Sequence, residues 1–168
     1  MLAILPQLHV RPIDRADRAL LADAFERMSE RSRYQRFLHP KPRLTEEELD
    51  FFTDIDHRAH EAVAAVDPRD GSLVGVARYA TLGGDATTAD LAFFVVDDWH
   101  GRGIATMLVR ALLGRAEANG ITSFIALTLS ENAAARALLK RTGFRKVDSS
   151  HGVVEMRLEL GAPLRLAA

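Results

Sequence analysis

The sequence has no cysteine, and it has only one tryptophan and two tyrosines among its 168 residues. The absence of cysteine excludes a disulfide scaffold, a thiolate zinc site and a cysteine nucleophile. It also fits a reducing compartment. No apolar run reaches the roughly 20 residues that a membrane-spanning helix needs. Residues 1–6 lack the basic start and the length of a secretory signal. We therefore expect a cytoplasmic protein without a membrane segment.

The sequence also lacks an excess of charge of either sign. Lysine and arginine number 22 and aspartate and glutamate 23, which gives a net charge of -1. This balance argues against binding nucleic acid through bulk positive charge. Hydrophobic residues make up 48% of the chain, enough to bury a core without a structural metal. We expect residues 1–168 to form a single domain, as a monomer or a homodimer.

The spacing of apolar residues predicts a mixed α/β fold. Thr45 and Glu48 form a capping-box pattern at the start of one helix, and Ser130 is expected to cap another. Residues 29–42, rich in Arg, Ser and Pro, predict irregular structure. Strands are predicted at 8–13, 59–66, 73–80, 89–96, 124–129, 144–147 and 153–160, and helices at 14–28, 45–53, 101–117 and 130–141.

A glycine-containing loop joins the strand predicted at 89–96 to the following helix. Gly101 and Gly103 allow the backbone to approach a ligand closely, and the free amides at a helix start favour an anion such as a pyrophosphate. Taken alone, the loop favours an ordinary tight turn over an anion site. Thr106 stands where a dinucleotide-binding loop has its third glycine, which disfavours a nicotinamide cofactor. No Gly-Lys-Ser/Thr follows, so a P-loop is excluded.

A second motif follows the next predicted strand and consists of Asn132, Ala135, Gly143 and Phe144. Together with His100-Gly-Arg-Gly-Ile-Ala105, it resembles the paired motifs of the GNAT superfamily of acyl-CoA-dependent N-acyltransferases, Q/R-x-x-G-x-G/A and N-x-x-A followed by Gly-Phe. The likeness covers roughly residues 73–160. It implies the GNAT fold: a twisted, mostly antiparallel sheet of six to seven strands that splays into a V, flanked by about four helices.

A narrower likeness covers residues 28–105, which resemble the catalytic domain of bacterial GNAT protein lysine acetyltransferases. Those enzymes carry an A-E-x-A segment on the central strand, where this chain has Ala89-Asp-Leu-Ala92. The acceptor stays open at this point and is either a protein lysine or a small-molecule amine. The other matching segments are Ser32–Phe37, Leu44–Leu49, Asp56, His60, Ala62–Ala65 and Gly75–Tyr79.

The resemblance implies a ternary complex in which an amine attacks the thioester of acetyl-CoA directly, with no metal. Asp90 is the implied general base, because a lysine ammonium with a pKa near 10.4 must first lose a proton. Tyr34, Arg78 and Tyr79 are the expected acceptor contacts. The expected acetyl-CoA contacts are Phe93, Phe94, Val95, His100, Gly101, Arg102, Gly103, Ile104, Ala105, Thr106 and Asn132.

Three residues depart from the family pattern. His100 replaces the usual glutamine or arginine, and Asp90 replaces glutamate. Leu139 stands seven residues after Asn132, where many members have a tyrosine that protonates the leaving thiolate; solvent or Ser130 would then serve. These departures keep a second hypothesis open, that of an acyl-CoA-sensing module without catalysis. Turnover with any amine separates the two.

Two further groups of side chains have more than one interpretation. His57 and His60 have the spacing of metal ligands on a helix, but no third imidazole or thiolate is near, so polar packing is favoured. A basic cluster runs through residues 31–43. It either attracts CoA phosphates or an acidic partner, or is a solvated loop; the loop is favoured. The cluster consists of Arg31, Arg33, Arg36, Lys41 and Arg43.

Overall fold

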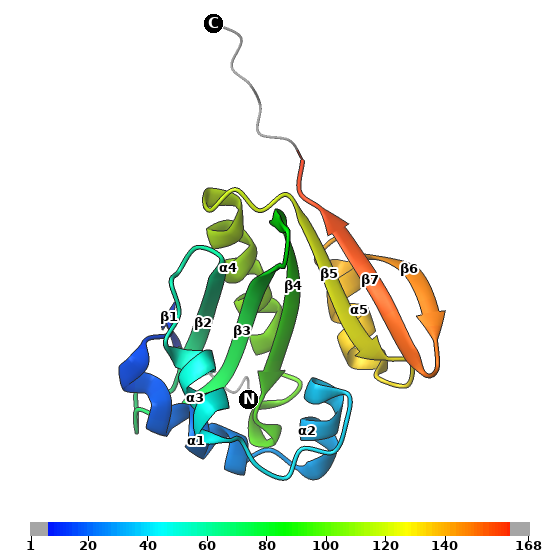
Figure 1. Cartoon of the computed structure of the whole chain (residues 1–168). Helices are drawn as coiled ribbons and strands as arrows, with labels where there is room; N and C mark the ends of the chain where they lie inside the picture. The colour runs from blue at the N-terminus through cyan, green and yellow to red at the C-terminus, as the bar shows by residue number, and fades with distance from the viewer. Residues whose placement is uncertain (1–6, 162–168) are drawn as a thin grey trace, which may run out of the picture.

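The computed structural model describes residues 7–161, which form a seven-stranded sheet in the order β1-β2-β3-β4-β5-β7-β6 (Figure 1). The strands are β1 His9–Pro12, β2 His60–Val66, β3 Leu73–Leu82, β4 Asp85–Val95, β5 Ser123–Leu129, β6 Arg145–Ser150 and β7 Val153–Glu159. The α-helices are α1 Arg18–Glu26, α2 Glu30–Phe37, α3 Glu46–Thr53, α4 Ile104–Ala118 and α5 Ala133–Arg141, and short 3-10 helices cover Arg15–Asp17 (η1) and Asp97–Trp99 (η2).

All neighbouring strands pair antiparallel except β4 and β5, which run parallel. These two strands pair only over Thr88–Asp90 of β4 and Ser123–Ile125 of β5. Beyond Asp90 they diverge, and the V-shaped gap between their ribbons is visible in Figure 1. The predicted mostly antiparallel, splayed sheet is confirmed, with five α-helices where about four were expected.

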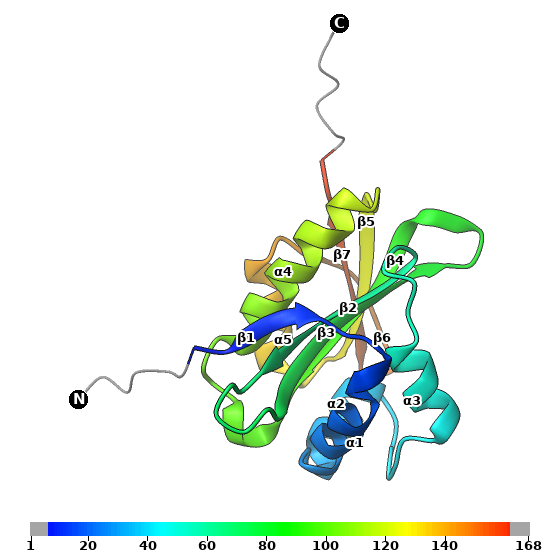
Figure 2. The ribbon, with the colours of Figure 1, turned by 90° about the vertical axis from the view of Figure 1, so that its left-hand side faces the viewer.

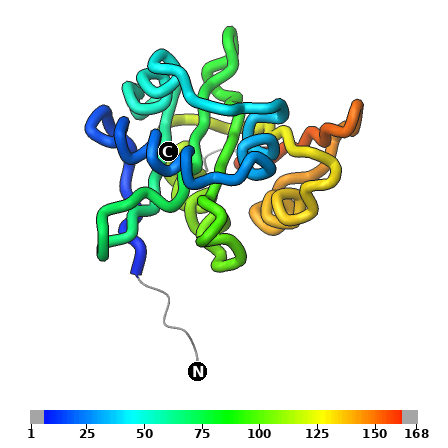
Figure 3. The backbone as a smooth tube through the Cα atoms, turned by 90° about the horizontal axis from the view of Figure 1, so that it is seen from below, coloured from blue at the N-terminus to red at the C-terminus, as the bar shows by residue number. Residues whose placement is uncertain are grey.

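Helices cover both faces of the sheet. Figures 2 and 3 show α4 and α5 on one face and α1, α2 and α3 on the other. Helix α4 buries one apolar face, which includes Leu108 and Leu112. It lies close to β3 at Gly75, where an added Cβ would come within 3.0 Å of the Phe94 carbonyl oxygen and 3.1 Å of Leu108. A side chain at this position would push the helix away from the sheet.

The structure corrects the prediction that residues 29–42 are irregular, because α2 occupies Glu30–Phe37. Ser29 caps this helix by accepting the Ser32 amide. Asp97 of η2 then holds the helix start, accepting the Ser29 amide at 2.9 Å and the Ser29 and Ser32 hydroxyls at 2.7 and 3.0 Å. The helix carries almost no apolar stripe, so periodicity could not predict it; a partner distant in the sequence anchors it.

Two helix starts differ from their predictions. The first helix begins with the 3-10 turn η1, capped by Asp14, before α1 starts at Arg18. The last helix is capped by Asn132, whose side chain accepts the Ala135 amide, and the prediction of a Ser130 cap was wrong. In residues 7–161, no helix combines the length and apolar character needed to span a bilayer.

Candidate active site

The divergence of β4 and β5 opens a cavity of about 620 Å³. One wall is the end of β4, the other is formed by β5 and the start of α5, and α2 and the start of α4 close the ends. All eleven residues expected to contact acetyl-CoA line this cavity: Phe93, Phe94, Val95, His100, Gly101, Arg102, Gly103, Ile104, Ala105, Thr106 and Asn132. The fold therefore brings together two motifs that are separate in the sequence.

The register of β3 and β4 decides which main-chain groups face the cavity. Val96 donates its amide to the Val74 carbonyl, so the alternate pair Val76 and Phe94 also exchanges hydrogen bonds. The main-chain groups of Phe93 and Val95 consequently point away from β3, toward the opening where β5 no longer pairs. The main-chain groups of Phe94 pair with β3, and Phe94 is among the residues that line the cavity.

His100 contacts the same strand edge. Its Nε2 lies 2.7 Å from the Val95 carbonyl oxygen, and a neutral imidazole protonated at Nε2 donates this hydrogen bond. The ring therefore occupies one of the main-chain acceptors that face the cavity. A ligand that pairs with β4 here must share the Val95 carbonyl with His100 or displace the ring.

The loop before α4 has the geometry of an anion site. Gly101 and Gly103 have φ of 72° and 76°, and an added Cβ at either position would meet nothing within 4 Å, so backbone conformation is the reason for glycine here. Met107 donates to the Gly103 carbonyl at 3.1 Å. The amides of the preceding turn, Ile104–Thr106, have no intrahelical acceptor and line the cavity. They fit a pyrophosphate.

Arg102 stands at the mouth of the cavity. It donates to the Asp98 carbonyl at 3.1 Å, and its guanidinium lies 4.8 Å from the centre of the Trp99 ring. Asn132 contributes from the facing wall. Because its Oδ1 accepts the Ala135 amide at 3.1 Å, its amide nitrogen remains to donate to a ligand.

No tyrosine is among the described residues that line the cavity. Leu139, which stands at the family's tyrosine position, is buried and lines the wall with a hydrocarbon side chain. The tyrosine acid that many family members use toward the leaving thiolate is therefore absent from the described part of this wall. Ser130 also lies outside the lining residues, and its amide donates to the Gly152 carbonyl.

Asp90 lies where β4 and β5 separate. It is opposite Ala80 of β3 and Ile125 of β5, and its side chain keeps access to solvent. Desolvation by the surrounding protein raises the pKa of the Asp90 carboxyl above the ordinary value for aspartate, and the positive charge of Arg36 opposes this rise. A raised pKa makes the carboxylate a better proton acceptor.

The register places Asp90 and Arg78 on the same face of the sheet, the face covered by α1–α3. Arg78 is opposite Ala92, two residues along β4 from Asp90. Arg78 is only 7% exposed, donates to the Phe52 carbonyl at 3.3 Å and contacts Nε2 of His60. Burial lowers the pKa of Arg78 to about 9, and burial together with Arg78 lowers the pKa of His60 to about 4.

Tyr79 was expected to contact the acceptor together with Arg78, and the structure contradicts this. Neighbouring residues of a strand point to opposite faces, so Tyr79 faces α4 and is fully buried. Its hydroxyl donates to the Arg58 carbonyl and accepts from Asn119, both at 2.8 Å. Tyr34 is 40% exposed on α2 but is not among the lining residues. Its role stays a prediction.

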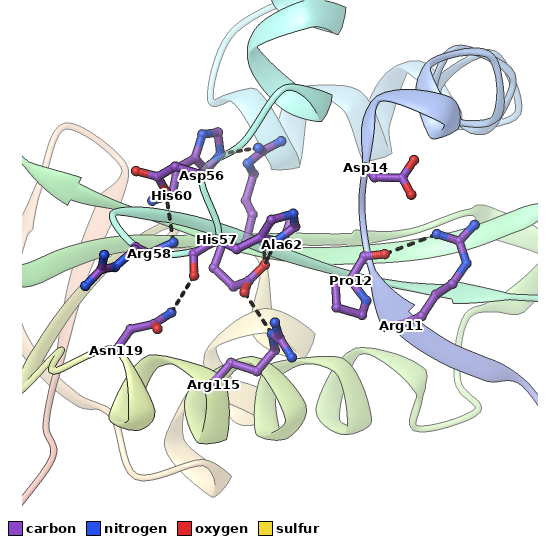
Figure 4. A network of polar contacts seen from close by, with 12 residues as sticks. Arg11, Pro12, Asp14, Asp56, His57, Arg58, His60, Ala62, Arg115 and Asn119 are labelled. Carbon is purple, nitrogen blue, oxygen red and sulfur yellow. Dashed lines mark hydrogen bonds and ion pairs between the residues drawn. The ribbon is translucent and has the colours of Figure 1, made fainter.

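A polar network lies on the α4 face of the sheet, around fully buried Glu61 (Figure 4). Glu61 accepts from Nε of Arg115 at 2.8 Å and from Nδ1 of His57 at 2.9 Å. Asn119 donates to the His57 carbonyl at 2.9 Å, as the dashed line in Figure 4 shows. His57 and His60 are thus engaged by Glu61 and Arg78. Within residues 7–161, no three potential ligands lie close enough to hold a metal ion.

Two residues of this region were missed as site residues. Arg36 lines the cavity from α2, and Asp97 anchors that helix through Ser29 and Ser32. Ser29 followed by Glu30, a capping residue before an acidic first turn, is a helix-start signal that could have revealed α2. Nothing in the sequence distinguishes Arg36, as a site residue, from the other basic residues around it.

Comparison with known proteins identifies relatives of the whole described fold. A family model described as "Acetyltransferase (GNAT) domain" matches residues 7–145. The acetyltransferase Pat of Mycolicibacterium smegmatis is 29% identical over 152 residues, which cover 90% of this chain and 45% of Pat. The acetyltransferase PA5475 of Pseudomonas aeruginosa is 31% identical over 150 residues, which cover 86% of this chain and 80% of the relative.

A solved structure supports the same relationship. The crystal structure of the GNAT domain of S. lividans PAT superposes with a TM-score of 0.86 at 30% sequence identity, covering 91% of this chain and 90% of that domain. The chain thus corresponds to about half of the longer Pat relative and to nearly all of an isolated GNAT domain. The family model, the fold and the paired motifs agree: the chain belongs to the GNAT family of acetyltransferases.

Proposed function

We propose that this protein transfers an acetyl group from acetyl-CoA to a primary amine by direct attack in a ternary complex. The observation that carries the proposal is an arrangement of three features: an anion-binding helix start and a free strand edge line one cavity, and Asp90 precedes the lining residue Leu91 at the point where the strands separate. This arrangement suits an acyl-CoA and an amine together.

The shape of the cavity supports a defined placement of acetyl-CoA. The pyrophosphate would accept hydrogen bonds from the amides of Ile104–Thr106. The pantetheine arm would lie along β4 and pair with the main-chain groups of Phe93 and Val95, as an added strand does. Asn132 would donate its amide hydrogens to the same arm. The thioester would then lie near Leu91 and Asp90.

The amine must be neutral to attack. Asp90 would accept its proton, directly or through one water, since an aspartate side chain is short. The nitrogen forms a bond to the thioester carbonyl carbon, and a main-chain amide of β4 would stabilise the developing oxyanion. The carbon–sulfur bond then breaks and CoA leaves as the thiolate, which takes up the proton from Asp90 or solvent. A thiol pKa near 8.5 allows this departure without a dedicated acid.

Direct transfer agrees with two features of the chain. The sequence has no cysteine, so the acetyl group cannot pass through a protein thioester. Leu139 stands where many GNAT enzymes have a side-chain acid. The leaving CoA thiolate would therefore take its proton from solvent or from Asp90.

Thermal shift and thiol release test this function. Acetyl-CoA and CoA should raise the Tm and NAD should not, and amine acceptors should release CoA thiol from acetyl-CoA. Stabilisation by NAD alone would contradict the proposal. Binding of acetyl-CoA without turnover of any amine, lysine peptides included, would favour the acyl-CoA-sensing module instead.

The proposal also covers organisation and partners. It treats residues 1–168 as a single domain that acts as a monomer or homodimer, without nucleic acid or membrane partners.

A further inference from the structure

Arg36 presents a cationic group to the cavity without a protein partner. Within residues 7–161, its guanidinium takes part in no ion pair and no side-chain hydrogen bond. Its one recorded contact is with the face of Phe37, 4.7 Å from the ring centre. None of its nitrogen atoms is enclosed without a partner, so they open onto accessible space. Five hydrogen-bond donors in a planar fork are therefore available to a ligand.

The position of Arg36 is on the acceptor side of the site. It lines the large cavity and also a smaller one between the sheet and helices α1 and α3, together with Met28, Ala92 and Phe94. Arg78 lines the smaller cavity behind it. Both arginines lie on the face of the sheet to which Asp90 belongs, whereas the proposed pyrophosphate site is at the far end, before α4.

The charges of Arg36, Arg78 and Asp90 do not cancel. Arg36 and Arg78 are cationic at neutral pH, and His60 is neutral because burial and Arg78 hold its pKa at about 4. Asp90 is the one carboxylate whose charge acts on Arg36, yet no ion pair joins it to either arginine. Partly buried cations without a counter-ion are costly, and an incoming anion would relieve that cost.

We propose that the acceptor is an amino acid, whose carboxylate pairs with Arg36 while its amine faces Asp90. This inference rests on the proposed acetyl transfer and names its acceptor class. A guanidinium fork matches a carboxylate with two parallel hydrogen bonds. Because Arg36 lines the cavity whose wall at Leu91 adjoins Asp90, and no ion pair joins the two side chains, a molecule with an amine and a carboxylate a few bonds apart would bridge them. Met28 and Phe94 supply apolar surface for its side chain.

The reaction with an amino acid follows the same bond and proton changes as the acetyl transfer described above. The amine nitrogen bonds to the acetyl carbon, the carbon–sulfur bond breaks, and the amine proton passes through Asp90 to the CoA thiolate or solvent. The products are an N-acetyl amino acid and CoA. The carboxylate of the acceptor takes no part in bond formation and serves only to position the amine.

Matched acceptors test the proposal in a thiol-release assay with saturating acetyl-CoA. The panel contains the twenty amino acids and their amides, 3-methylbutylamine and a capped lysine peptide without carboxylates. We expect at least one amino acid to exceed its amide about tenfold or more in kcat/KM, the scale of a charged hydrogen-bonded pair. For leucine, leucinamide and 3-methylbutylamine supply the carboxylate-free comparison. Arg36→Gln should remove this preference, and Arg36→Lys should retain part of it.

Arg110→Gln provides the matched control, because Arg110 is exposed on α4 and outside the cavity. It should keep the wild-type preference. Equal kcat/KM for amino acids and their amides would overturn the proposal, as would a preference for the lysine peptide or no turnover of any amino acid. Transfer to the peptide would still leave the acetyltransferase function standing. That function fails only if no amine consumes acetyl-CoA.

Discussion

Asp90 and Ile125 form the last residue pair that joins β4 to β5. The carboxylate of Asp90 therefore stands at the apex of the opening, next to the strand edge along which the thioester is proposed to lie. The positions of the other residues of the proposed site are described relative to this pair. The anion-binding loop lies at the far end of β4, and Arg36 lines the cavity from α2.

The first prediction concerns folding stability. Desolvation raises the folded-state pKa of Asp90, so ionisation of its carboxyl opposes folding. Stability from this group is present below the unfolded pKa of about 3.9 and is lost as pH rises through the raised folded value. Asp90→Asn should therefore raise the Tm at pH 7, by about 1–3 °C, with no gain near pH 3. Calorimetry at both pH values checks this, and a lower Tm at pH 7 would contradict the raised pKa.

The second prediction concerns the pH dependence of turnover. A general base must be ionised, so activity should fall as pH drops through the pKa of Asp90, at a higher pH than an ordinary aspartate would give. The acceptor amine also ionises, and its contribution is common to wild type and variant. The ratio of wild-type to Asp90→Asn kcat/KM, measured from pH 4 to 9, isolates the Asp90 step. A flat ratio would exclude Asp90 as the base.

The third prediction tests the anion loop through two glycines. Gly103 has φ of 76°, which costs about 1–2 kcal/mol for an L side chain. Gly103→Ala should therefore turn the loop amides and weaken acetyl-CoA binding about 5- to 30-fold by calorimetric titration. Gly114 is exposed within α4 and has open space around it. Gly114→Ala should stabilise the fold by about 0.5–1 kcal/mol and leave binding unchanged. Equal affinity in both variants would argue against a pyrophosphate at this loop.

The fourth prediction separates scaffold from site. Glu61 is fully buried, accepts hydrogen bonds from Arg115 and His57, and does not line the cavity. Glu61→Gln should lower the free energy of unfolding by about 1.5–3 kcal/mol, the scale of charged hydrogen bonds. In urea titrations, exposed Glu117→Gln should change it by less than about 0.5 kcal/mol. The kcat of folded Glu61→Gln should match wild type; a selective loss of kcat would place Glu61 in the active site.

Local patterns predicted most of the fold. Apolar runs marked the central strands, because β2 and β3 are buried on both faces. The apolar spacing of α4 marked that helix, because it buries one face of its own sequence. Helix α2 escaped this logic. Its segment Glu30–Phe37 is mostly charged, and Asp97, far along the chain, fixes its first turn. Tertiary contacts of this kind leave no periodic pattern of apolar residues in the sequence.

The candidate site was predicted where backbone motifs define it and was uncertain where side chains do. The glycine loop and Asn132 converge as the resemblance implied, since both follow strand ends that meet at one cavity. The prediction that Arg78 and Tyr79 both contact the acceptor was wrong, because adjacent residues of a strand face opposite sides of the sheet. The sequence does not state the strand register, so it could not show that the main-chain groups of Phe93 and Val95 are free while those of Phe94 pair with β3.

The most direct test of the account compares wild type and Asp90→Asn in two measurements on the same preparations. Calorimetric titration gives the Kd for acetyl-CoA, and thiol release gives kcat with the best acceptor at saturating acetyl-CoA. The account predicts equal Kd values and a loss of kcat of about 10²–10⁴-fold. An Asp90→Asn variant that binds acetyl-CoA and keeps the wild-type kcat would contradict it.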